Sequence, residues 1–167
     1  MVSTYRWLFQ TGDMLRHRKV TQFGRYAMLV TPYLFFNGRC EEALDYYTRA
    51  LGAEIGLQMR YKDCPEPLDP TMVPPGSENL IMHASFKVGE TTILASDGCV
   101  AQPSQISGFG LSLQPGTPAE AERLFAALAD GGQVRMPMAK TFFSPCFGMV
   151  ADRFGVSWMV YVPQATP

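Results

Sequence analysis

The sequence predicts an α+β fold made of two β-α-β-β-β modules, and three observations support this prediction. Residues 31–53 read as an apolar strand, a tight polar turn and an amphipathic helix. Residues 108–132 repeat that order, and each repeat is followed by runs that alternate as strands do. Four apolar helix positions recur at one constant offset: Ala43 and Ala121, Tyr46 and Leu124, Tyr47 and Phe125, and Ala50 and Leu128. A period this long indicates two similar modules that cover each other, because neither module alone buries its sheet.

The first module begins with an apolar strand, Tyr33–Phe36, and the turn Asn37–Gly38. Asn and Gly tolerate positive φ, so they suit a tight turn between two periodic segments. The helix that follows carries Glu41 and Glu42 in its first turn, where the helix dipole favours acidic side chains. Gly52 is expected to end this helix as its C-cap.

Three further strands complete the first module. Residues 53–61 alternate as a half-buried strand, and Leu80–Val88 pairs with Thr91–Ser96 as a β-hairpin around a glycine turn. Between them, residues 62–79 carry several prolines, which supply no backbone donor and exclude an internal strand. A loop of this length is usually functional or mobile, so we expect it over a pocket mouth or a subunit boundary.

The second module has its own start and stop signals. A strand at Phe109–Leu113 precedes a helix at Pro118–Ala129, with Thr117 as the N-cap and proline at the first helical position. The turn at residues 152–155, Asp-Arg-Phe-Gly, joins the last two strands, and its glycine accepts a positive φ. The three closing strands are expected at residues 133–139, 147–151 and 156–162.

Residues 1–28 differ from the rest of the chain. They are basic, with one acidic residue, and their apolar positions keep no period. They lack the apolar region of a secretory signal. Three interpretations stay open: a translated leader ahead of a true start at Met28, which we favour, a basic arm that packs on the domain or on a second subunit, and a targeting peptide. We therefore divide the chain into an extension (1–28), a first module (29–98), a linker (99–107) and a second module (108–167), with 29–167 as one domain.

Composition excludes several classes of function. The 14 Lys and Arg residues nearly balance the 15 Asp and Glu residues, which argues against nucleic acid or a membrane surface as the main partner. No run of about 18 apolar residues is present, so we expect no transmembrane helix. The four cysteines, Cys40, Cys64, Cys99 and Cys146, stand far apart and fit neither a zinc knuckle nor a disulfide framework. We expect reduced thiols in a cytoplasmic protein.

Several motifs together resemble one known superfamily. They are TPYLFFNG at 31–38, EEALDYY at 41–47, HASF at 83–86, Ser96–Asp97, and DRFGVSW at 152–158. The combination is similar to the vicinal oxygen chelate superfamily, which includes glyoxalase I, extradiol dioxygenases and bleomycin- and fosfomycin-resistance proteins, and within it to the PhnB-like branch. The resemblance covers about residues 30–162. It implies a glyoxalase/bleomycin resistance fold, with the strands in a curved mixed sheet around a central cavity, and a homodimer.

The resemblance also implies where a metal would bind. Enzymes of the superfamily hold a divalent ion with His or Glu from the first and last strands of each module. In this sequence, those positions fall on residues without such side chains: Pro32, Phe109, Met159 and either Leu94 or Ala95. Hard and borderline divalent ions need oxygen or nitrogen ligands. We therefore expect no metal cofactor, and the alternative is zinc, nickel or iron in a shifted site that uses His83.

His83 is the candidate catalytic residue, as a general base, a hydrogen-bond donor or a lone metal ligand, and a partly buried strand histidine is the alternative. Ser96 and Asp97 are expected at the cavity edge against substrate, unless Asp97 caps the linker turn. Further substrate-binding positions come from the strands: Tyr33, Phe35, Phe109, Leu111, Trp158 and Met159. Such a lining suits a flat or apolar small molecule, and the alternative is that these side chains fill the core.

The sequence thus favours a metal-free protein that binds a small, partly apolar molecule, in the manner of resistance proteins that sequester a drug. One alternative is a metal-dependent lyase or isomerase of the glyoxalase type, or a dioxygenase, that uses His83. Another is a dimeric scaffold whose cavity is filled by its own side chains. PhnB-like proteins are sometimes labelled methyltransferases. Gly108-Phe109-Gly110 lacks the third glycine and the βαβ context of a dinucleotide fingerprint, so we expect no S-adenosylmethionine site.

Overall fold

The computed structural model describes residues 28–68, 73, 75–98 and 106–164 of the chain. The expected extension, apart from Met28, and most of the expected linker lie outside these residues. Within the described residues, no helix is long and apolar enough to cross a membrane.

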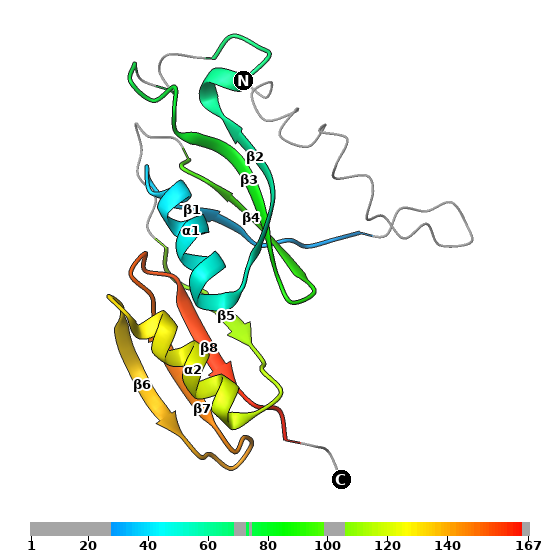
Figure 1. The fold of residues 1–167 in the computed structure, drawn as a ribbon, viewed down its shortest axis with the longest axis vertical. Coiled ribbons are helices and arrows are strands. Elements are labelled where there is room, and N and C mark those ends of the chain that lie inside the picture. The colour runs from blue at the N-terminus through cyan, green and yellow to red at the C-terminus, as the bar shows by residue number, and fades with distance from the viewer. Residues whose placement is uncertain (1–27, 69–72, 74, 99–105, 165–167) are drawn as a thin grey trace, which may run out of the picture.

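The first module has the predicted order of one strand, one helix and three strands (Figure 1). Its sheet runs in the order β1-β4-β3-β2, with β1 parallel to β4 and the other neighbours antiparallel. A short 3-10 helix after β2 was not predicted. The elements are β1 (Tyr33–Phe35), α1 (Cys40–Leu51), β2 (Glu54–Arg60), the 3-10 helix η2 (Tyr61–Asp63), β3 (Ile81–Val88) and β4 (Thr91–Ser96).

The second module repeats this arrangement, which confirms the internal duplication and the α+β class. Its sheet runs β5-β8-β7-β6, again with one parallel pair, β5 and β8. β6 is an edge strand, carries Pro137 and shows two register shifts against β7. The elements are β5 (Leu111–Leu113), α2 (Pro118–Ala129), β6 (Gln133–Ala139), β7 (Phe147–Ala151) and β8 (Ser157–Tyr161).

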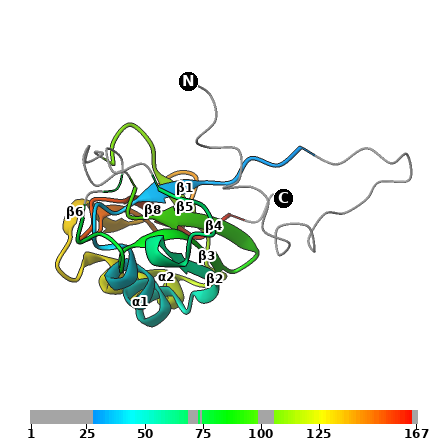
Figure 2. The same ribbon diagram turned by 90° about the horizontal axis from the view of Figure 1, so that it is seen from above.

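Both helices lie on the same side of the two sheets (Figure 2). The helices contact each other, and the Tyr46 hydroxyl in α1 donates a hydrogen bond of 2.8 Å to the Ala127 carbonyl in α2. In the described part of the chain, no helix covers the opposite side of either sheet (Figure 2). We call that side the open face.

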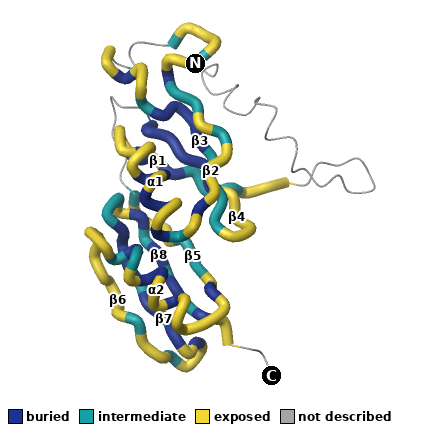
Figure 3. Tube along the Cα trace, viewed as in Figure 1, coloured by how far each residue is buried: buried dark blue, intermediate teal, exposed yellow. Residues whose placement is uncertain are grey.

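The predicted helix signals act as expected. Gly52 ends α1 with φ of 68°, and its N–H donates to the Thr48 carbonyl. Thr117 begins α2, because its hydroxyl accepts a hydrogen bond of 3.2 Å from the Glu120 N–H, and Pro118 takes the first helical position. The apolar stripe of each helix is buried against its sheet, so the interior strands are dark in Figure 3.

The hydrophobic core is continuous across the two modules. Tyr47 of α1 stacks on Phe86 of β3 at a centroid distance of 5.3 Å and meets Trp158 of β8 at 5.8 Å. Tyr47 and Trp158 are both nearly inaccessible to solvent. A phenol and an indole need hydrogen-bond partners when they are buried, and Asp152 supplies the acceptor for both.

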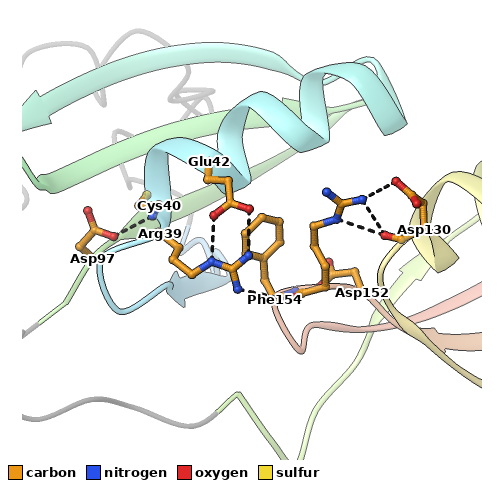
Figure 4. A network of polar contacts seen from close by, with 8 residues as sticks. Arg39, Cys40, Glu42, Asp97, Asp130, Asp152 and Phe154 are labelled. Atoms are coloured by element: carbon orange, nitrogen blue, oxygen red, sulfur yellow. Dashed lines mark hydrogen bonds and ion pairs between the residues drawn. The ribbon is translucent and has the colours of Figure 1, made fainter.

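Two arginines stack on aromatic rings at the surface where the modules meet, and we call this surface the module seam (Figure 4). Arg39 forms a two-pronged ion pair with Glu42, and its guanidinium lies 4.5 Å from the centre of the Phe154 ring. Arg153 likewise pairs with Asp130 and lies 4.7 Å from the centre of the Tyr46 ring. Each arginine therefore pairs with an acidic residue of its own module and stacks on an aromatic ring of the other module.

Candidate functional site

The open face of the first sheet carries most of the predicted site. Residues that pair across strands share a face, and Tyr33 pairs with Leu94, Phe35 with Ser96, and Met59 with His83. The intervening residues Leu34 and Phe86 point to the helices and are buried in the core. The open face of this sheet thus presents one imidazole among apolar and hydroxyl groups: Tyr33, Phe35, Met59, His83, Ser85, Leu94 and Ser96.

A hydrogen bond joins two of these residues. The Tyr33 hydroxyl lies 2.9 Å from Nδ1 of His83, and the two rings lie 5.7 Å apart. Tyr33 also stacks on Phe35, at 5.0 Å between centroids and 27° between planes. His83 is 5% exposed, so the imidazole is held in one place by a phenol and by close packing. Sequence reasoning named each residue but not the pair.

Burial keeps this pair uncharged. Burial lowers the pKa of His83 below its ordinary value of about 6.5. Burial also raises the pKa of Tyr33 to about 12, and a hydrogen bond with Ser96 acts in the opposite direction. At neutral pH the imidazole is therefore neutral and the phenol protonated. Either tautomer of His83 leaves Nε2 to donate or to accept one hydrogen bond.

Ser96 and Asp97 are both buried, and Asp97 has a clear structural role. Its two carboxylate oxygens accept hydrogen bonds from the Cys40 N–H at 2.7 Å and from the Ile81 N–H at 2.8 Å. Arg39 makes no side-chain cap, so Asp97 caps α1 in its place through Cys40 (Figure 4). Through Ile81, Asp97 also holds α1 to the start of β3. The cap serves α1 and not the linker turn that the sequence suggested.

The second module places its predicted site residues differently. Leu111 pairs with Trp158, and the Trp158 indole donates to Asp152 in the core, so both side chains lie on the helix side. The prediction that Leu111 faces a ligand is wrong, because its side chain packs against the core. Relative to the helix repeat, the alternation of β5 is shifted by one residue from that of β1, and a shift of one residue exchanges the two faces of a strand. Phe109 precedes β5 and is half exposed, whereas Met159 lies on the open face.

The positions where the superfamily resemblance places metal ligands, on the first and last strands of each module, are called the corner positions here. Their side chains do not fit a hard or borderline divalent ion. Leu94 and Met159 lie on the open face, and Ala95 pairs with Leu34 on the helix side. Among the described residues, no three His, Cys, Asp or Glu side chains gather closely enough to hold a metal. In the described part of the chain, His83 belongs to no such group, and its Nδ1 is hydrogen-bonded to the Tyr33 hydroxyl.

A cavity of about 360 Å³ lies at the module seam. Phe36, Arg39 and Phe154 line it, together with Phe35 at the end of β1. Phe35 is the one residue of the predicted site that lines this cavity. The polar groups of Arg39 are engaged by Glu42 and by the Arg153 carbonyl, so the cavity is framed by rings more than by free charge (Figure 4).

Comparison with known proteins places the chain among relatives along most of its length. A family model described as 3-demethylubiquinone-9 3-methyltransferase matches residues 28–161. The protein YjdN of Escherichia coli K12 is 34% identical over 145 residues, which cover 84% of this chain and 99% of that protein.

Solved structures agree with this assignment. Protein PA1353 from Pseudomonas aeruginosa is 44% identical, with a TM-score of 0.72 over 83% of this chain and 99% of that one. A structure titled putative 3-demethylubiquinone-9 3-methyltransferase, PhnB protein, from Bacillus cereus is 29% identical, with a TM-score of 0.67 over 81% and 99% of the two chains. A glyoxalase-related enzyme from Fulvimarina pelagi, 17% identical with a TM-score of 0.57 over 84% and 91%, shares the fold alone.

Proposed function

Because the chain belongs to the family described as 3-demethylubiquinone-9 3-methyltransferase, in the PhnB-like branch of the vicinal oxygen chelate superfamily, we propose a binding function for it. We propose that the protein binds a small, partly apolar molecule on the open face of its first sheet. The single observation that carries the proposal is the Tyr33–His83 hydrogen bond. A buried, neutral imidazole fixed by a phenol is a specific polar group within an apolar surface, which is the usual make-up of a ligand site.

The side chains around the pair indicate the class of ligand. Tyr33 and Phe35 offer a stacked aromatic surface, and Met59 and Leu94 add apolar contacts. Tyr33, Met59, Ser85 and Leu94, which share this face with His83, carry no formal charge. The next register pair brings in Arg60, opposite Ile81, and its guanidinium is already paired with Glu41. Nε2 of His83 is the group that would bond a polar atom of the ligand, with Tyr33 as the positioning residue. An uncharged, flat molecule with one hydrogen-bonding group fits this surface.

We include the absence of a divalent metal and of S-adenosylmethionine in the proposal. The corner residues Pro32, Leu94, Phe109 and Met159 supply no ligand that zinc, nickel or iron prefers. The family description names a methyltransferase, yet Gly108-Phe109-Gly110 leads into the short strand β5 and lacks the third glycine of a nucleotide loop. Binding therefore rests on the chain's own side chains.

A second candidate function is a proton-transfer reaction of the lyase or isomerase class. The observation that favours it is the lowered pKa of His83, which keeps the imidazole ready to accept a proton at neutral pH. His83 would be the base and Tyr33 the residue that fixes its ring. Turnover of a bound compound would separate this candidate from simple sequestration.

We also propose a homodimer in the cytoplasm. Apolar side chains remain exposed on the second module, and a partner subunit would cover them: Val134, Phe142 and Phe143. Cys40, Cys64 and Cys146 are free thiols, which suits a reducing compartment. Sizing chromatography with light scattering tests the dimer, and a monomer at micromolar concentration would contradict it.

The test of ligand binding is a thermal-shift screen of the full, untagged chain against uncharged planar heterocycles and their carboxylated counterparts. We expect stabilisation by uncharged compounds only, and loss of that stabilisation in His83→Ala. Tyr33→Phe removes one hydroxyl and should weaken binding, whereas the matched control Tyr161→Phe, on the second sheet, should not. Equal stabilisation of native protein and His83→Ala would overturn the proposal, and so would stoichiometric divalent metal that His83→Ala loses.

A further inference from the structure

Three methionines form a row across the open face of the second sheet. Met136 of β6 pairs with Met149 of β7, and Met149 pairs with Met159 of β8. The strands β6, β7 and β8 are neighbours in the sheet (Figure 1), so their paired residues form one row. Met136 is 44% exposed, and the other two are half-buried. This row does not belong to the core, which lies on the helix side.

The spacing of the row allows the three sulfurs to meet. Paired residues on neighbouring antiparallel strands have Cβ atoms roughly 4.5–5.5 Å apart. Methionine is unbranched and turns about three side-chain bonds, so the outer two thioethers can lean toward the central one. Met149 occupies the middle of the row, so an ion shared by the three sulfurs would lie above β7. The methyl carbon of Met159 lies beside Gly110, so this side chain has to turn toward Met149 to bind the ion.

The donor chemistry selects the ligand. A thioether is neutral and polarizable, and sulfur ligands of this kind select Cu(I) over hard divalent ions. Met159 contributes one such thioether from β8. The two neighbouring methionines supply the further sulfurs that a single thioether needs to hold an ion.

The row and the register rows beside it contain no carboxylate and no imidazole, and their oxygen donors, on Ser112, Gln133, Ser157 and Tyr161, are neutral. On one side, Phe147 pairs with Tyr161, and their rings lie 6.4 Å apart. On the other side, Ala151 pairs with Ser157. Aromatic rings beside the row limit water at the sulfurs and add an attractive face for a cation.

We propose that Met136, Met149 and Met159 form a binding site for one soft monovalent cation with a filled d shell, with Cu(I) as the physiological candidate. The site lies on the second sheet and does not depend on the Tyr33–His83 pair of the first sheet. It needs no redox step and no acidic residue.

The test uses silver nitrate as a stable Ag(I) probe in chloride-free buffer. Thiolates also bind Ag(I), so the full chain carries Cys64→Ser and Cys99→Ser, and the two other cysteines, Cys40 and Cys146, are buried. Methionine is labelled with ¹³C at the methyl carbon and observed by NMR. We expect one equivalent of Ag(I) to shift the three methyl signals of the row and no others, and anaerobic Cu(I) to shift the same three.

Leucine substitutions assign the signals and separate the metal site from the apolar surface. Met149→Leu keeps volume and should remove stoichiometric Ag(I) binding without affecting the fold. Met138→Leu is the matched control, because Met138 packs against the core and its sulfur lies beside Gly148, as the Phe125 ring of α2 does. This variant should bind Ag(I) as the native chain does. Unshifted row methyls, or native binding by a folded Met149→Leu, would overturn the site. Ligand binding near His83 should survive Met149→Leu, so the two proposals fail separately.

Discussion

The phenol of Tyr47 in the first module donates a hydrogen bond of 2.7 Å to a carboxylate oxygen of Asp152 in the second module. The same oxygen accepts from the Trp158 indole, and the other accepts from the Phe154 and Val156 N–H groups. Burial raises the pKa of Tyr47, so the phenol stays protonated and able to donate. One buried carboxylate therefore closes the last hairpin and joins it to the helix of the other module.

Asp152→Ala is expected to be the most damaging polar substitution in the protein. It leaves a phenol, an indole and two backbone donors buried without an acceptor, and each such loss costs about 1–3 kcal/mol. We expect the free energy of unfolding to fall by about 4 kcal/mol or more, measured by urea denaturation. The control Asp45→Ala, on the exposed side of α1, should change it by no more than about 0.5 kcal/mol. Similar losses in the two variants would contradict the role of Asp152.

Asp97→Ala tests the remote cap of α1. The change leaves the Cys40 and Ile81 N–H groups buried without their acceptor, at a cost of about 2–6 kcal/mol in total. Hydrogen exchange should speed up at these two amides more than at the middle of α1. Thr117→Ala, which removes the local cap of α2, should cost only about 1 kcal/mol. If Thr117→Ala proved the costlier change, the assignment would fail.

Two glycines give opposite predictions for the same substitution. A Cβ at Gly132 would lie 2.4 Å from the Ala151 carbonyl oxygen and 2.9 Å from that of Leu128, and backbone atoms cannot move aside cheaply. Gly132→Ala should therefore destabilise by about 1–3 kcal/mol or more. Nothing lies within 4 Å of the corresponding point at Gly116, so Gly116→Ala should be neutral or stabilise by up to about 1 kcal/mol. Melting temperatures in the reverse order would refute the packing at β6.

His83 should make stability fall in weak acid. Its pKa is lowered in the folded state, so below about pH 6.5 the unfolded chain binds more protons than the folded one. Stability attributed to His83 is complete above that pH and is lost as the pH falls toward the folded-state pKa. We would measure unfolding by urea from pH 7.5 to pH 5 in native protein and in His83→Gln. The slope should be smaller in the variant, and parallel curves would show that His83 is not buried as a neutral imidazole.

The parts of the fold that the sequence predicted depend on local signals. The start of α2 is marked by Thr117 and Pro118, the end of α1 by Gly52, and the last turn by Gly155. All three signals act as expected. The helix α2 has the predicted bounds, Pro118–Ala129. The repeat of apolar positions was enough to predict the duplicated module.

The candidate site was harder to predict because its contacts join distant residues. Tyr33 and His83 are 50 positions apart, and Asp97 caps Cys40 from 57 positions away. No local pattern encodes such pairs. Leu111 shows the other difficulty: the alternation of a strand gives two faces, and only the register with β8 decides which one is covered by a helix. The methionine row escaped notice for the same reason, since Met136, Met149 and Met159 meet only once the strands are paired.

The proline of β6 limits how copies of this protein can associate. An exposed sheet edge normally offers a ladder of N–H and C=O groups on which another chain can grow a continuous sheet, as in a fibril. Pro137 contributes no N–H to that ladder, and the two register shifts of β6 bend the strand away from a flat template. The β6 edge is therefore protected against runaway polymerisation by strand addition.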